Sequence, residues 1–97
     1  MTYRVVWPER MRDKLASWKL PDEILVDVLL RARNLSQRPA EQLVRSTAVF
    51  DGMALAFSVI DPKNRLAEYR FLLHVTYGQD EQSLYISNGI CQVAFGW

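Results

Sequence analysis

The stretch from Glu68 to Tyr77 constrains the fold more than any other part of the sequence, because its apolar and polar residues alternate with a period of two. Successive side chains of a β-strand point to opposite faces of a sheet. One row holds Ala67, Tyr69, Phe71, Leu73, Val75 and Tyr77, and the other holds Glu68, Arg70, Leu72, His74 and Thr76. We therefore expect a strand whose apolar face is covered by helices and whose polar face stays open.

The first half of the chain has helical periodicity after one short strand. Tyr3–Trp7 alternates and predicts a strand, and a helix follows from Pro8, because proline is favoured at the first position of a helix. Pro21 ends this helix and begins a second one, which runs to a loop at Asn34–Pro39. Ala40–Arg45 is expected to add one short helical turn. The apolar positions at helical spacing are Met11, Leu15, Trp18, Ile24, Leu25, Val28, Leu29, Ala32 and Leu35.

The period changes to two in the second half. Met53–Ile60 alternates, and the turn sequences Asp61–Asn64 and Gly78–Gln82 enclose the strand described first. Leu84–Ser87 and Ile90–Phe95 are also strand-like, and the Asn88-Gly89 pair between them indicates a tight turn or a bulge. The expected order is β-α-α-β-β-β. It predicts one α+β domain over residues 1–97, with two N-terminal helices packed on one face of a mainly antiparallel sheet.

Composition limits the classes of function. With 97 residues, 49% of them hydrophobic, the chain is expected to fold around a single core. A net charge of +1 gives no general indication of nucleic-acid binding. No apolar run approaches the roughly 20 residues that span a bilayer, and no signal-peptide pattern precedes the first strand. The single cysteine, Cys91, fits a reducing compartment, so we expect a cytoplasmic protein with no membrane association.

Arg70, His74 and Glu68 are the candidate catalytic residues of the open face. Glu68 or His74 can take a proton, and Arg70 can stabilise negative charge that develops on a phosphate. This combination suits acid–base cleavage of a phosphodiester. The same polar row is also typical of the solvent face of an antiparallel sheet, with Glu68 and Arg70 as a surface ion pair. No metal-ligand spacing or glycine-rich phosphate loop is present in the sequence, so no metal or cofactor is expected.

Further residues of the later strands are candidates for binding. Tyr85, on the last part of the sheet, can stack on an exposed base. Lys63 and Arg65, beside the turn before the central strand, are candidate cations, although solubility also explains them. Ala54 and Ala56 are expected to form the floor of a shallow groove on the open face.

Several short segments, taken in order along the chain, resemble one family of bacterial proteins. They are Pro8-Glu9-Arg10-Met11 after the first strand, the loop with Arg38-Pro39, Tyr69-Arg70-Phe71-Leu72-Leu73, the acidic turn Gln79-Asp80-Glu81 and the strand segment Ile86-Ser87-Asn88-Gly89. In this order, and at this chain length, they resemble the RelE/ParE superfamily of toxins from type II toxin–antitoxin systems.

The resemblance implies a RelE-like fold and a partner antitoxin peptide or protein. It also implies either a ribosome-dependent endoribonuclease that cleaves mRNA without a metal or an inhibitor of DNA gyrase. Of the nuclease branch's active residues, only Arg70 carries over, because Ala54, Ala56, Ile90 and Cys91 stand where that branch has basic residues. The catalytic set is therefore a degenerate one. The alternative is a catalytically inactive binding or dimerisation module of the same fold, and the apolar final segment favours a homodimer.

Overall fold

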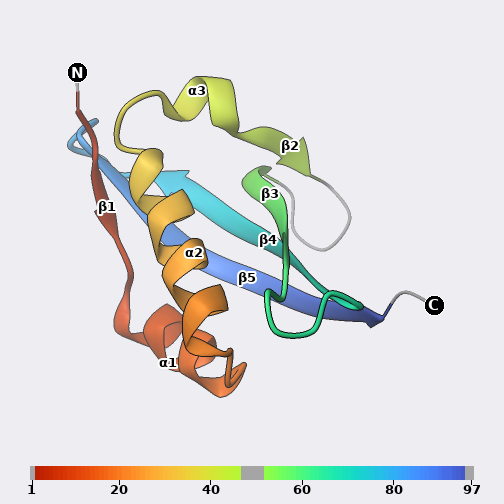
Figure 1. The fold of residues 1–97 in the computed structure, drawn as a ribbon. Coiled ribbons are helices and arrows are strands. Elements are labelled where there is room, and N and C mark those ends of the chain that lie inside the picture. Colours follow the sequence, from red (N-terminus) through yellow and green to blue (C-terminus); the bar gives the residue numbers. More distant parts are fainter. Residues whose placement is uncertain (1, 47–51, 96–97) are drawn as a thin grey trace.

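The structure is a computed structural model that describes residues 2–46 and 52–95. Three helices and five strands follow one another along the chain (Figure 1). They are β1 (Arg4–Val6), α1 (Glu9–Ser17), α2 (Asp22–Asn34), α3 (Pro39–Gln42), β2 (Val44–Ser46), β3 (Gly52–Ile60), β4 (Ala67–Tyr77) and β5 (Ser83–Phe95). The molecule is an α+β domain, as the sequence predicts.

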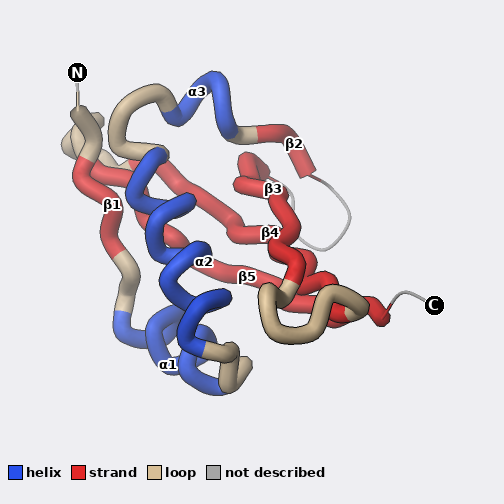
Figure 2. The backbone as a smooth tube through the Cα atoms, viewed as in Figure 1, coloured by secondary structure: helices blue, strands red, loops and turns tan. Residues whose placement is uncertain are grey.

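The five strands form one sheet in the order β1-β5-β4-β3-β2. β1 lies parallel to β5, and every other neighbouring pair is antiparallel. Helix α2 lies across one face of this sheet, and α1 packs beside it at the end where β1 leads into the helices (Figures 1 and 2). The sheet is therefore mainly antiparallel and is covered by helices on one face.

Alternation along β4 sorts its residues as the sequence predicts. Phe71, Leu73 and Val75 are buried against the helices, whereas Arg70 and Thr76 on the other row are exposed. Ile24 and Val28 of α2 are fully buried in the same core. Two predicted positions differ: Leu29 of α2 is 41% exposed, and Tyr77, the last residue of β4, is 48% exposed.

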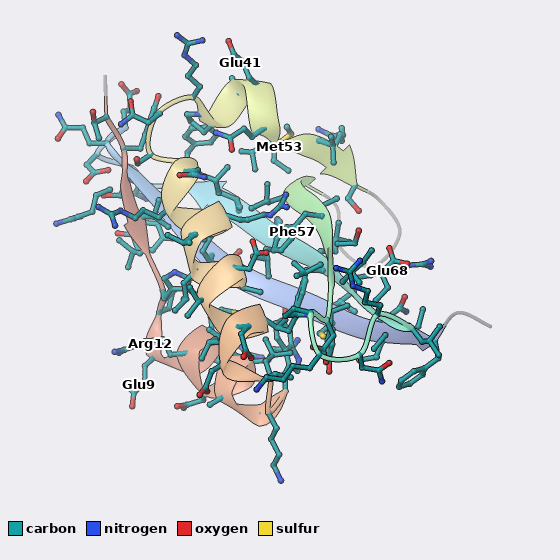
Figure 3. All side chains as sticks on the ribbon, in the orientation of Figure 1. Glu9, Arg12, Glu41, Met53, Phe57 and Glu68 are labelled. Carbon is teal, nitrogen blue, oxygen red and sulfur yellow. The ribbon has the colours of Figure 1, made fainter. Side chains whose placement is uncertain are left out.

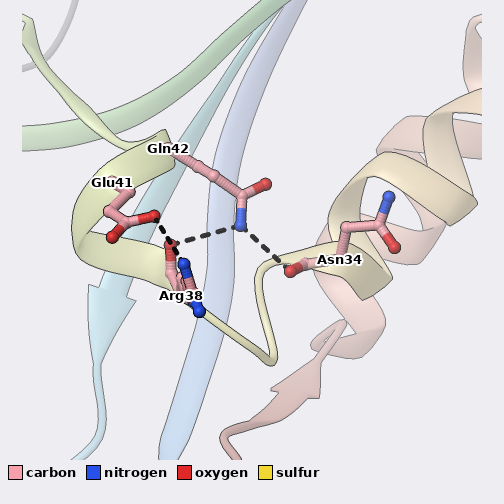
Figure 4. A network of polar contacts seen from close by, with 4 residues as sticks. All are labelled: Asn34, Arg38, Glu41 and Gln42. Atoms are coloured by element: carbon pink, nitrogen blue, oxygen red, sulfur yellow. Dashed lines mark hydrogen bonds and ion pairs between the residues drawn. The ribbon is translucent and has the colours of Figure 1, made fainter.

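Of the two short elements after α2, the helical turn was predicted and the strand was not. The expected helical turn at Ala40–Arg45 is instead α3, which begins one residue earlier at Pro39, followed by the three-residue strand β2. The side-chain amide of Gln42 donates hydrogen bonds to the carbonyls of Asn34 and Arg38, at 3.0 and 3.2 Å (Figure 4). These bonds fasten α3 to the end of α2 and direct the chain into β2, which pairs with β3.

The region of Asn88 and Gly89 is a bulge within one continuous strand, so the tight-turn alternative is wrong. β5 runs through it for 13 residues, and its register against β4 shifts between His74 and Val75. Asn88 pairs with His74 and Ile86 pairs with Val75, which leaves Ser87 as the extra residue. Such a bulge redirects side chains locally. Gly89 permits close packing here, because a Cβ on it would lie 2.9 Å from Met11 Cε of α1 and 3.0 Å from Leu73 Cδ2.

Candidate functional site

Arg70 and Glu68 contact each other on the open face of β4. Arg70 Nη2 lies 3.4 Å from Glu68 Oε2, and the arginine side chain is 60% exposed. The residues paired with Arg70 on the neighbouring strands are Ser58 and Gln92, both uncharged. An exposed pair of this kind stabilises the fold little. The guanidinium is therefore accessible to an anion from solvent, and the carboxylate beside it offsets part of its charge.

His74 lies on the same face but four residues along β4, which is about 13 Å from Arg70 at the rise of an extended strand. The three predicted catalytic residues thus fall into an Arg70–Glu68 pair and a separate histidine. The oxygens of one phosphate group cannot span that separation. A chain of nucleotides lying along β4 would meet both places.

The imidazole of His74 is held between its two neighbouring strands. Its Nδ1 atom lies 3.2 Å from the hydroxyl oxygen of Ser87, which is also 3.3 Å from the His74 carbonyl oxygen. On the other side, a Cβ added to Gly52 would lie only 2.5 Å from His74 Nε2. Gly52 also has a φ of +149°, a conformation that L side chains rarely adopt. Both the backbone and the histidine ring therefore require glycine at this position.

The expected alanine floor of the open face is only partly present. Ala56 is exposed, but Ala54 is fully buried. The residues paired with Ala54 on its two sides are His74 and Val44 of β2, the strand that the sequence did not predict. These larger neighbours cover Ala54, so the groove does not extend this far.

A cleft of about 390 Å³ lies between α1 and the bulge of β5. It is lined by Arg10, Met11, Asp13, Lys14, Ser87 and Asn88. Lys14 Nζ donates a 2.8 Å hydrogen bond to Asn88 Oδ1, which also accepts the Gly89 amide. Ser87 lines the cleft and its hydroxyl contacts His74, which does not itself line the cleft. The cleft therefore holds the side chains of two cations and one carboxylate, Asp13, and the histidine–hydroxyl pair lies next to it at Ser87.

The three predicted binding residues lie at opposite ends of the sheet. Tyr85 pairs with Thr76 near the end of β4, whereas Lys63 and Arg65 precede the start of β4, about 30 Å away along the strand. Tyr85 packs against Gly78, where a Cβ would lie 2.9 Å from Tyr85 Cε2. These residues cannot contact one nucleotide together.

Lys63 is engaged on the side of the turn nearest α2. Its Nζ atom lies 3.2 Å from Oε1 of Glu23, in the first turn of that helix. The pKa of Glu23 is lowered, first by a backbone hydrogen bond and then by Lys63. Arg65 is exposed in the same turn.

In Figure 3, Glu68 lies on the opposite side of the view from Glu9 and Arg12 of α1. The Arg70–Glu68 pair is therefore separate from the cleft, which α1 lines.

Sequence reasoning missed the cleft residues Arg10, Lys14, Ser87 and Asn88 as functional candidates. Two signals were available. Positions four apart share one face of a helix, which places Arg10 and Lys14 together. The bulge alternative at Asn88-Gly89 would also have displaced neighbouring side chains.

Several further properties of residues 2–46 and 52–95 bear on the site. No group of three or more His, Cys, Asp or Glu side chains in these ranges is arranged to hold a metal ion. No helix in them is long and apolar enough to cross a bilayer. Cys91 is half-buried on the helix-facing row of β5, and burial raises the pKa of its thiol. Its burial therefore suppresses the thiolate.

Comparisons of this chain with protein-family models, with curated proteins and with solved structures find no match.

Proposed function

We propose that this protein is a RelE/ParE-like toxin that cleaves RNA without a metal, at the cleft between α1 and the bulge of β5. The observation that carries the proposal is the contact between His74 Nδ1 and the Ser87 hydroxyl beside Arg10 and Lys14. Cleavage of a phosphodiester requires a base within hydrogen-bond distance of a hydroxyl and cations that stabilise the charge on the phosphate. The resemblance in segment order supports the choice of family, and with it a cytoplasmic location, an antitoxin partner and mRNA on the ribosome as substrate.

The proposed reaction is attack of a ribose 2′-hydroxyl on the adjacent phosphorus. Ser87 accepts the 2′-hydroxyl proton and passes its own proton to His74 Nδ1. The 2′-oxygen then bonds to phosphorus, and the bond from phosphorus to the 5′-oxygen breaks on the opposite side, where the leaving oxygen takes a proton from water. The imidazolium afterwards returns its proton to the solvent. Arg10 and Lys14 neutralise the charge that develops on the phosphate. Arg70, about 13 Å along β4, holds the phosphate of a neighbouring nucleotide.

The test is induced expression of the full chain in bacteria, with growth and the positions of transcript cleavage as readouts. Wild type is expected to arrest growth and cut transcripts. His74→Ala and Arg10→Ala are expected to lose both effects. Arg12→Ala is the matched control, since Arg12 is an exposed arginine of the same helix that does not line the cleft. Intact transcripts with wild type, or equal cleavage with His74→Ala, would refute the proposal.

A second candidate function is a catalytically inactive binding module of the same fold. It is favoured by the separation of Arg70 and Glu68 from His74, which leaves the three residues unable to act on one phosphate. A gyrase inhibitor belongs here too, because it would need no hydrolytic site. Purification together with the product of a neighbouring small gene, while wild type and His74→Ala both leave transcripts intact, would identify this function. Growth arrest with intact transcripts would point to gyrase.

A further inference from the structure

The outer edge of β5 has no partner strand along most of its length. β1 pairs only with Ser83 to Tyr85, and no other strand in the described part of the chain pairs with β5 on that side. Helix α1 packs against the strand at Gly89. Beyond it, Ile90–Phe95 runs past the helices toward the C-terminal end (Figure 1). Alternate residues of this run therefore present backbone N–H and C=O groups that no other described strand receives.

This edge lacks the devices that usually prevent strands from pairing. Proteins protect exposed edges with charged side chains, with proline or by covering them. β5 has no charged residue and no proline from Ser83 to Phe95. Val93 and Phe95, on its helix-facing row, are 45% and 57% exposed. The run therefore combines open backbone groups with exposed apolar side chains.

The opposite edge of the sheet is protected differently. β2 pairs with the first three residues of β3, and two cations lie near the remainder of β3 and the turn after it. The Arg31 guanidinium of α2 sits 5.3 Å from the centre of the Phe57 ring. The Lys63–Glu23 ion pair connects the turn after β3 to α2. A strand approaching β3 would meet these charges, whereas a strand approaching β5 beyond Gly89 would meet none on β5 itself.

We propose that Ile90–Phe95 pairs antiparallel with the same segment of a second copy of this chain. An uncharged strand can lie against itself about a two-fold axis without opposing like charges, which a strand with charges of one sign cannot do. A two-fold axis perpendicular to the sheet keeps each row of side chains on its own face, so the axis passes beside Val93, which then lies opposite its own copy. The exposed side chains of Val93 and Phe95 from both copies then cover one another on the helix-facing side.

The interface is small. Six residues from each copy, with two exposed apolar side chains apiece, bury less than the roughly 1,200 Å² at the lower limit of standard interfaces. The dimer is therefore reversible and depends on concentration. Because the pairing begins beyond Gly89, it leaves the cleft at Arg10 and Lys14 open, and it does not depend on the proposed nuclease function.

Sedimentation velocity of the full chain over a concentration series tests the proposal. Wild type is expected to double in mass from the 11.3 kDa of one chain as concentration rises. Val93→Glu and Val93→Lys should each stay monomeric, because like charges then meet near the axis. Mixing the two variants should restore the dimer as a one-to-one pair. Val26→Glu, at a similarly exposed position on α2, is the matched control and should dimerise like wild type.

A monomeric wild type at every concentration, or a dimer that survives Val93→Glu, would overturn the proposal. So would failure of the two charged variants to associate when both are folded by circular dichroism. If either variant does not fold, hydrogen exchange of wild type decides the question. Exchange of the amides in Ile90–Phe95 should slow as concentration rises, and exchange that is independent of concentration would refute the pairing.

Discussion

Replacing Gly52 with alanine tests how the structure holds His74. A residue with a side chain at a φ of +149° is strained, which costs about 1–3 kcal/mol in folding free energy. The added Cβ would also lie 2.5 Å from His74 Nε2, so the imidazole must leave its place beside Gly52. The histidine ring is the flexible partner in this contact. We therefore expect its displacement to add a cost of about 1 kcal/mol, in the range of an off-rotamer side chain.

A double-mutant cycle separates the two costs. In the His74→Ala background the clash is absent and only the backbone strain remains, so Gly52→Ala should cost about 1 kcal/mol less there than in wild type. Urea denaturation followed by tryptophan fluorescence measures each free energy of unfolding, and an unchanged slope shows that the unfolded states are comparable. In thermal unfolding, each 1 kcal/mol corresponds to roughly 4–8 °C for a domain of this size.

Two results would refute this reasoning. A cost below about 0.5 kcal/mol for Gly52→Ala in wild type would mean that neither strain nor clash is present, since surface substitutions fall within that range. Equal costs in the two backgrounds would mean that His74 does not occupy the position beside Gly52. Under the proposed function, Gly52→Ala should also reduce RNA cleavage, because displacement of the imidazole changes the contact between Nδ1 and Ser87.

Three further outcomes are expected. Leu73→Ala removes a fully buried side chain and should lower the free energy of unfolding by about 2–5 kcal/mol. Leu66 is 55% exposed, so Leu66→Ala should change this free energy by less than about 0.5 kcal/mol. Equal effects of the two variants in urea denaturation would contradict the packing. The pKa of Asp80 is lowered, first by the Gln82 amide and then by the Ser83 hydroxyl, so its contribution is present above about pH 4 and is lost as pH falls through the folded-state value. Thermal midpoints should therefore fall more steeply in acid for wild type than for Asp80→Asn, and parallel curves would refute this. Burial raises the pKa of Cys91, so a maleimide should label it more slowly in native protein than in urea, and equal rates would show an open thiol.

Local patterns predicted the elements that depend on neighbouring residues. The period of two in β4 identified its buried and open rows, because side-chain direction in a strand depends only on position. The two prolines located the starts of both long helices. β2 escaped prediction, because three residues carry too little periodicity and its pairing with β3 depends on the bonds that Gln42 makes to the end of α2. Only the folded chain brings those groups together.

The candidate site was harder to predict than the fold. Arg70, Glu68 and His74 were correctly placed on one face, but sequence spacing does not show that four residues along a strand separate catalytic groups too widely for one phosphate. The bulge at Ser87 turned a small polar residue into the partner of His74. Arg10 and Lys14 join it from a helix more than seventy residues earlier in the chain. A contact of that range depends on tertiary packing, which no local pattern encodes.

The parallel pairing of β1 with β5 joins the first described strand to the last one, with Arg4 opposite Ser83. Bringing together segments so distant in sequence costs loop-closure entropy before any contact compensates for it. Such connectivity slows folding relative to domains built from local contacts. During synthesis, β1 also has no partner strand until β5 has left the ribosome. We therefore expect β1 to join the sheet late in folding, so that a growing chain exposes this strand until β5 has been synthesised.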